Sequence, residues 1–314
     1  MKFKTTAIAM AVAGIVAAPV AVQAGADELY ASARVGVMYQ DDDVSDVADF
    51  DVRSMSSRFG MRGETDLGNG LTGFGRYEFG VNEGSESIDT RHLYVGLKGD
   101  WGSLTMGQTY HTWYNFVSGP LDIPWWHSLG ADIHTAGRTD NAITYAGGGG
   151  AIGFGVTAYF DRDEAEETAP DGIEAAVSFG LGDSTIGVGI STVDEDGAIG
   201  AQGQKGGSDR TEDIIGVTWS GIGIGDTTLG VGYQNQDDDD SFALHWDIAN
   251  FYVNASMLTQ DAADRDVTDI TLGYTQSLGR KTTMYYEVNT KDNDTGNSDD
   301  DYTAFMAVLK YDII

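Results

Sequence analysis

The feature that most constrains the fold is a strict alternation of apolar and polar side chains along most of the chain. In residues 241–248 every second side chain is apolar, and residues 268–277 and 282–290 repeat the pattern. Because successive side chains of a strand point to opposite faces, this period predicts strands with one apolar and one polar face. Similar segments lie near 29–39, 72–79, 92–98, 151–161, 173–181, 185–192, 213–219, 228–234, 251–258 and 302–313. Helical spacing is nearly absent, so the sequence predicts an all-β fold.

The expected connections alternate in length. The short ones, rich in Gly and Asn, are 66–70, 99–102, 147–150, 182–183, 221–226 and 277–281. The long ones, polar and acidic, are 40–52, 80–89, 162–171, 194–211, 236–240, 261–267 and 291–301, and 111–137 is a further long loop. Counting one strand on each side of every connection gives about 16 strands. Short periplasmic turns on one rim and long external loops on the other are typical of an outer-membrane β-barrel.

Residues 1–24 have the pattern of a secretory signal peptide. Lys2 and Lys4 precede an apolar stretch from Ala7 to Val22, and Ala24 is the small residue after which cleavage is expected. The apolar stretch is shorter than the roughly 20 residues of a spanning helix. We therefore expect residues 25–314 to form one β-barrel domain in the outer membrane.

Composition excludes several classes of protein. Lys and Arg total 18 against 49 Asp and Glu, a formal charge of −31, which excludes a general nucleic-acid binder. The absence of Cys excludes disulfides, thiolate metal sites and thiol catalysis. A soluble β-protein of a halophile is the alternative to a barrel. Aromatic residues near the expected strand ends favour the barrel, because such rings suit the membrane–water interfaces: Tyr39, Phe79, Trp101, Phe160, Phe179, Trp219, Tyr233, Phe251, Tyr302 and Tyr311.

Three segments resemble the general diffusion porins of Gram-negative bacteria. They are residues 57–71 (SRFGMRGETDLGNGL), residues 91–104 (RHLYVGLKGDWGSL) with Met106-Gly107-Gln108 after them, and residues 138–145 (RTDNAITY) after a long loop. The resemblance covers the whole mature chain and implies a transmembrane, antiparallel, 16-stranded β-barrel that assembles as a homotrimer. It also implies that the third external loop, about 111–137, folds into the lumen as a constriction. Porins of this type usually end in Phe, whereas this chain ends in Ile314.

The polar face of the first and last strands predicts a basic wall in the pore. Its residues are Arg34, Arg58, Arg62, Arg76 and Lys98, with Lys310 on the closing strand. The opposing acids would come from the constriction loop: Asp122, Asp132 and Asp140. Facing rows of opposite charge create a transverse field that orients polar solutes. The alternative is that each cation pairs with a neighbour such as Glu64 or Glu78 and stiffens the wall.

No pattern points to catalysis, and we expect no enzyme, no catalytic residue, no cofactor and no metal site. His92, His111, His127, His134 and His245 do not have metal-ligand spacing, and nucleophile-elbow, zinc-protease and phosphate-loop motifs are missing. The acidic loops are open to three interpretations: a mouth that concentrates cations, divalent-ion bridges to lipopolysaccharide, or solvated surface. Residues 292–299 have alternating oxygen ligands but lack the terminal Glu of an EF-hand.

The sequence thus predicts an outer-membrane porin for passive diffusion of small hydrophilic solutes and ions, with a preference for cations. Its expected partners are two further copies of the chain, outer-membrane lipid and lipopolysaccharide, and the solutes, with no nucleic acid. The alternative function is a substrate-specific channel for a sugar or another small solute, in which the aromatic residues of the constriction loop would form a stacking track.

Overall fold

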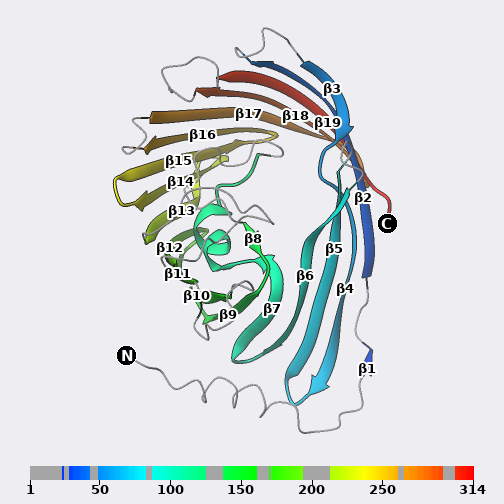
Figure 1. The fold of residues 1–314 in the computed structure, drawn as a ribbon, viewed down its shortest axis with the longest axis vertical. Helices are drawn as coiled ribbons and strands as arrows, with labels where there is room; N and C mark the ends of the chain where they lie inside the picture. Colours follow the sequence, from blue (N-terminus) through cyan, green and yellow to red (C-terminus); the bar gives the residue numbers. More distant parts are fainter. Residues whose placement is uncertain are drawn as a thin grey trace.

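The strands of the computed structural model form one closed, antiparallel β-barrel (Figure 1). The structure describes residues 23–24, 28–42, 49–82, 87–124, 137–160, 170, 172–193, 213–260, 265–292 and 301–314. Residues 1–22 of the expected signal peptide and residues 125–136 of the expected constriction loop lie outside this part of the chain. The short segment β1 (Gln23–Ala24) pairs with β4.

Sixteen strands make up the barrel, as the sequence predicts. They are β2 (Glu28–Asp42), β3 (Asp49–Ser54) together with β4 (Ser57–Gly68), β5 (Leu71–Asn82), β6 (Ser87–Gly99), β7 (Gly102–Tyr110), β9 (Ala142–Gly149), β10 (Ile152–Tyr159), β11 (Gly172–Leu181), β12 (Ser184–Val193), β13 (Ile214–Ile224), β14 (Thr227–Gln236), β15 (Asp239–Ile248), β16 (Phe251–Gln260), β17 (Arg265–Gly279), β18 (Thr282–Asp292) and β19 (Tyr302–Asp312). The two-residue segment β8 (Arg138–Thr139) pairs with the end of β7.

Hydrogen bonding between the last strand and the first long strand closes the ring. β19 pairs with β2 from Tyr302 opposite Asp42 to Asp312 opposite Ser32. Every barrel strand then has a neighbour on both sides, so no open edge is left to pair with another chain. A closed sheet is also the only sheet that satisfies its backbone groups inside a lipid bilayer.

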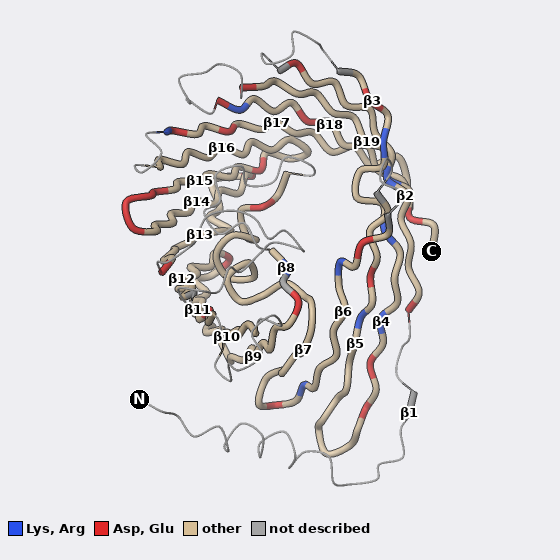
Figure 2. The backbone as a smooth tube through the Cα atoms, viewed as in Figure 1, with Lys and Arg blue, Asp and Glu red and all other residues tan. Residues whose placement is uncertain are grey.

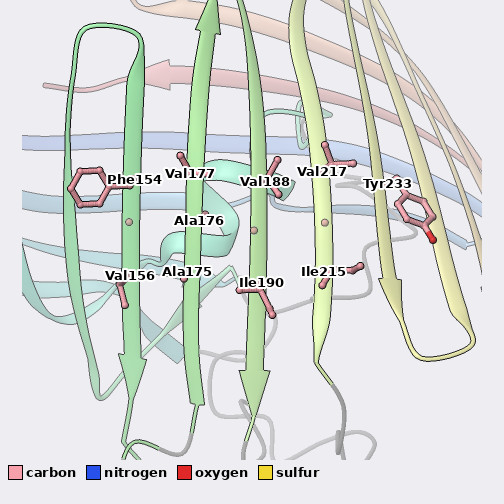
Figure 3. A pocket seen from close by; sticks show the side chains of 13 residues that line it. Phe154, Val156, Ala175, Ala176, Val177, Val188, Ile190, Ile215, Val217 and Tyr233 are labelled. Carbon is pink, nitrogen blue, oxygen red and sulfur yellow. The ribbon is translucent and has the colours of Figure 1, made fainter.

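Alternation along the strands divides the wall into an apolar outer face and a polar inner face. Figure 3 shows the outer face of β10–β14, where Phe154, Val188 and Val217 point away from the barrel interior. A shallow groove of about 730 Å³ on this face is lined almost wholly by apolar side chains. Tyr302 is an exception to the sequence analysis: it shares the inward register of the buried Ala304 and Met306, so it does not belong to the outer aromatic set.

Tight turns join strands where the sequence predicts them. Between β4 and β5, Asn69 has φ 53° and Gly70 has φ 75°, the left-handed conformation that a two-residue hairpin requires. One predicted long loop, 236–240, is wrong: β15 begins at Asp239, and Asp237, with φ 50°, is part of a tight turn. The amide of Asn235 donates to the carbonyl oxygens of Asp237 and Asp239 and stabilises that turn.

The segment after β7 enters the barrel instead of covering its rim. It contains a single turn of π-helix, η1 (Tyr114–Ser118), which Figure 1 shows inside the ring of strands, against β11, β12 and β13. Among the described residues, no helix combines the length and the apolar character needed to cross a bilayer.

We predict that the outer face of the barrel tolerates a charged side chain near a turn but not in the middle of a strand. Val188 lies in the middle of β12 on the outer face, so Val188→Arg should lower the free energy of unfolding by about 2–4 kcal/mol. Ile224, at the turn end of β13, is the matched control, and Ile224→Arg should cost at most about 1 kcal/mol. Urea unfolding in lipid vesicles measures both values, and equal losses would show that the outer face does not contact hydrocarbon.

Candidate functional site

Five arginines gather around one buried glutamate on the inner face of the barrel. We call Arg34, Arg58, Arg76, Arg91 and Arg138 the arginine cluster. The Glu78 side chain is fully buried, and its carboxylate oxygens lie 2.5 Å from Nη2 of Arg76, 3.0 Å from Nε of Arg91 and 3.8 Å from Nη1 of Arg58. Arg34 and Arg138 lie near enough to Arg91 and Glu78 to interact with their charges. One carboxylate therefore neutralises only part of a dense positive patch.

Strand register explains why most of these side chains meet. Arg76 and Glu78 are two positions apart on β5, and Glu78 lies opposite Gly60 and His92 of the neighbouring strands. Because side chains two positions apart share a face, both point into the lumen. The Tyr30 hydroxyl, from β2, donates to Glu78 at 2.9 Å and accepts from Nε of Arg76 at 2.8 Å. The patch is thus a hydrogen-bonded network and not a chance meeting of charges.

Arg91 reaches the cluster because of an irregularity in the sheet. The pairing of β5 with β6 shifts register between Glu78 and Phe79, so that Arg91 is the extra residue of a β-bulge. A bulge redirects a side chain that alternation would send to the other face. Gly80 of β5, which pairs with Asp89, leaves room for the Arg91 side chain, because a Cβ there would lie 3.2 Å from Cδ of Arg91. Alternation alone therefore misses Arg91, and no sequence signal marks the bulge.

The predicted basic wall is present on the inner face but is divided in two. Arg34, Arg58 and Arg76 belong to the arginine cluster. Arg62 pairs with Glu28 at 2.5 Å and Lys98 pairs with Glu64 at 2.6 Å, both at exposed positions away from Glu78. The alternative interpretation, in which each cation pairs with a neighbouring acid, describes Arg62 and Lys98. The arginine cluster, in contrast, has more positive than negative charge. A role in the constriction stays a prediction for all five residues.

The opposite wall has no Lys or Arg among its described residues. From β9 to β16 the described residues contain no Lys or Arg, and Figure 2 shows the basic residues concentrated on the side of β2–β6. The segment from His111 to Pro124 lies against this second wall and between the two. We call it the inner loop; it is the described part of the predicted constriction loop 111–137.

Stacked tyrosines connect the inner loop to the arginine cluster. The rings of Tyr110 and Tyr114 stack at 4.3 Å, and the Arg138 guanidinium lies 5.0 Å from the centre of the Tyr110 ring. The Tyr114 hydroxyl donates to Asp122 at 2.9 Å. Burial, together with Asp122 and Tyr110, raises the pKa of Tyr114 above its ordinary value, so the phenol keeps the proton that it donates. Asp122 is thereby held on the loop.

Buried polar groups anchor the start of the inner loop to β10 and β11. Glu174, fully buried on β11, accepts hydrogen bonds from Nδ1 of His111 and from the backbone N–H of Trp113, both at 2.7 Å. The Thr157 hydroxyl on β10 accepts from the backbone N–H of Thr112 at 3.0 Å. Hydrogen bonds to a buried carboxylate are among the stronger ones in proteins, so this end of the loop is rigidly placed.

Apolar packing and two further hydrogen bonds hold the rest of the inner loop. Trp113 and Val117 pack with Ile214 of β13 in a buried cluster. The Thr218 hydroxyl donates to the Val117 carbonyl at 2.6 Å, and the Asn254 amide donates to the Leu121 carbonyl at 2.8 Å. The expected folding of this loop into the lumen is confirmed for its described part.

The three predicted loop acids have different surroundings. Asp122 lies on the inner loop, bonded to Tyr114. Asp140 is exposed and lines a groove with Leu93 and Met106, whose side chains face outward, so the structure does not bring it into a row facing the arginines. Asp132 lies outside the described residues. Of the three acids predicted to face the basic wall, the structure therefore supports Asp122 alone.

The described part of the chain contains no candidate metal centre. Among the described residues, no group of three or more His, Asp or Glu side chains could hold a metal ion. His111, His92 and His245 lie on different elements, and residues 293–299 of the acidic segment lie outside the described residues. Of the loop aromatics, Trp113 is fully buried, so its ring does not contribute to a stacking track for a sugar, and Tyr110 covers one face of the Tyr114 ring. The expected absence of a cofactor stays a prediction.

A closed barrel with an apolar outside, a charged inner wall and a loop folded inward defines the class of membrane channel proteins. Comparison with known proteins gives the family. The family model "Gram-negative porin" matches residues 5–296, so the chain belongs to the Gram-negative porin family and is a protein of the outer membrane. Porins are channel proteins and not enzymes, as the sequence analysis expects.

Relatives and solved structures agree with this assignment. Outer membrane protein F of Serratia marcescens is 36% identical over 102 residues, which are 28% of this chain and 26% of that protein. The chain spans between a quarter and about half the length of the curated relatives it matches. The anion-selective porin from Comamonas acidovorans superimposes with a TM-score of 0.70 at 17% identity, over 92% of this chain and 100% of that one. The trimer form of OmpT from Vibrio cholerae gives a TM-score of 0.67 at 18% identity, over 92% and 100%.

We predict that Glu78 stabilises the barrel much more than an exposed acid does. Glu78→Gln leaves Arg58, Arg76 and Arg91 without their shared carboxylate, and the free energy of unfolding should fall by about 2 kcal/mol. Glu64→Gln breaks only the exposed pair with Lys98 and should cost about 0.5 kcal/mol. Urea unfolding in detergent micelles compares the two, and similar losses would contradict a stabilising role for the network.

We also predict that Glu174 holds the inner loop without holding the barrel. Glu174→Ala removes the acceptor of His111 and Trp113, so amide hydrogen exchange should accelerate in residues 111–121 and stay unchanged in β13–β16. Ser178→Ala, on the inner face of the same strand, is the matched control and should leave the loop protected. Unchanged exchange of the loop in Glu174→Ala would show that apolar packing alone places it.

Proposed function

We propose that this chain forms a water-filled pore through which small hydrophilic solutes and ions diffuse passively across the outer membrane. The observation that carries the proposal is the inner loop, seated against the wall of β10–β14 with the arginine cluster on the other side of the lumen. This arrangement narrows the passage between a wall that has no Lys or Arg among its described residues and a wall that carries the arginine cluster. A narrow, charged passage selects solutes by size and by polarity.

The charges support a transverse field in the constriction. Positive charge belongs to one wall, and the opposite wall carries none among its described residues. Asp122 contributes negative charge from the inner loop, held in place by Tyr114. Fixed charges in a passage with low-dielectric walls focus the field, so polar solutes are oriented and apolar solutes are slowed.

We further propose a mild to moderate preference for cations. The formal charge of the chain is −31, and its acidic runs lie in the expected external loops and hairpins. Within the described residues, Asp237–Asp240 form one such acidic hairpin between β14 and β15. Exposed acids at a pore mouth raise the local concentration of cations.

The arginine cluster opposes that preference, and the salt concentration sets the balance. The Debye length is about 8 Å at physiological ionic strength and about 3 Å at 1 M, so exposed mouth charges lose influence as salt rises. The arginines line the narrow passage and are screened less. The Comamonas acidovorans porin is named as anion-selective, but a likeness at 17% identity supports the fold alone. We therefore expect the preference for cations to weaken at high salt.

We propose that three copies of the chain assemble into a homotrimer. A solved form of the Vibrio cholerae OmpT, which shares this fold, is named as a trimer. The outer face of this barrel exposes large apolar side chains on β2–β6 that a neighbouring copy would cover, among them Leu29, Val52, Met61 and Val95. The remaining outer face would contact lipid and lipopolysaccharide.

We predict stepwise conductance in planar bilayers, in groups of three, with a reversal potential of the cation-selective sign in dilute KCl. Asp237→Asn with Asp238→Asn should reduce that potential, and Arg91→Gln should increase it, since each removes charge of one sign. At 1 M KCl the wild-type preference should be smaller. An anion-selective potential in dilute salt would contradict the proposed selectivity, and a complete lack of steps would contradict the pore itself.

A further inference from the structure

The inner loop meets the barrel wall at glycines. On the inner face of four strands, six glycines lie where the loop packs, and we call them the glycine seat: Gly155 of β10, Gly187 and Gly189 of β12, Gly216 of β13, and Gly230 and Gly232 of β14. Ala176 supplies the small residue on β11, between the first two of these strands. The seat therefore follows the loop across five neighbouring strands.

A methyl group at any of these six positions would lie closer to the loop than ordinary van der Waals contact. At Gly189 a Cβ would lie 2.8 Å from Cγ2 of Val117, and at Gly216 it would lie 2.8 Å from Cη2 of Trp113. At Gly187 it would lie far inside the van der Waals contact distance of the Phe116 carbonyl oxygen. At Gly155 an added Cβ would lie 3.0 Å from Oγ1 of Thr112 and next to the Phe116 ring. At Gly230 and at Gly232 it would lie 2.6 Å from a terminal methyl carbon of Leu121.

The backbone gives no reason for glycine at these positions. None of the six has the positive φ that favours glycine, unlike Gly150 or Gly182 in the turns. Glycine in the interior of a strand weakens the strand, because it gains no side-chain packing and loses more conformational freedom on folding. The space that glycine leaves for the loop is therefore what explains the six positions.

We propose that the glycine seat determines the selectivity of the pore for solute size, by setting how closely the inner loop approaches the wall. This inference rests on the pore function proposed above. The residues Trp113 and Val117 are at most 1% exposed and are already packed against the wall, so their side chains have no free space to move away from an added methyl group. Because closely packed side chains leave no free space, an added methyl group would shift the loop as a whole. The loop would move toward the arginine cluster and narrow the passage.

The test substitutes one seat glycine and then removes its contact. Gly189→Ala should lower single-channel conductance by on the order of a quarter, and permeation of uncharged sugars should fall with it, because pore diameter limits both. Adding Val117→Ala removes the branched side chain that the new methyl group meets, and conductance should return toward the wild-type value. The reversal potential should change little, since no charge is altered.

The matched control is Gly223→Ala. Gly223 lies on β13, the strand of the seat residue Gly216, has no positive φ, and has no neighbour within 4 Å of an added Cβ, so the conductance of this variant should equal that of the wild type. Wild-type conductance in a folded Gly189→Ala protein overturns the inference. If that variant does not fold, Gly230→Ala replaces it, because its Cβ meets only the flexible end of Leu121 and should give a smaller fall. Unchanged conductance there overturns the inference too.

The same measurements separate this inference from the proposed function. A wild-type protein that shows no conductance steps contradicts the pore, whatever the variants do. A wild-type protein that conducts, with variants that conduct equally and a crystal structure of Gly189→Ala with an unmoved inner loop, contradicts the glycine seat alone.

Discussion

Backbone hydrogen bonding in a medium without water is the constraint on which this structure depends. Every N–H and C=O group of a spanning sheet must find a partner, and closure between β19 and β2 supplies the last set. Closure turns the alternation of side chains into an inside and an outside. Apolar residues such as Val188 and Val217 face outward, while Arg76, Glu78 and Thr157 face inward. The enclosed lumen is the space into which the inner loop folds.

The two sides of the lumen are built on different physical principles. The wall of β2–β6 is electrostatic: Arg58, Arg76 and Arg91 share Glu78, and hydrogen bonds such as that of Tyr30 hold the network. The wall of β10–β14 is steric: among its described residues it has no Lys or Arg, and glycines such as Gly189 and Gly216 make room for the loop. Charge and width of the passage can therefore vary independently.

Alternation made the strands and the inward direction of Arg34, Arg58 and Arg76 predictable, and the resemblance to general diffusion porins predicted the position of the loop. Arg91 was not predictable, because a β-bulge between β5 and β6 interrupts the period on which the prediction depends. The run Asp237–Asp240 suggested a long loop, yet hydrogen bonds from Asn235 fold it into a tight turn. The glycine seat was not predictable for another reason. The spacing of residues in a sequence indicates which face of a strand each residue occupies, but not which segment packs against that face.

The pairing of β19 with β2 also has a consequence for how the chain folds. It joins Ser32 to Asp312, nearly the two ends of the described chain, so the ring cannot close before β19 is present. Contacts this distant in sequence slow folding, because the entropy of closing the loop is lost before the contacts form. Until then, strands with apolar faces and unpaired edges are exposed to aggregation. Safe delivery of the unfolded chain to the membrane is therefore a requirement set by topology.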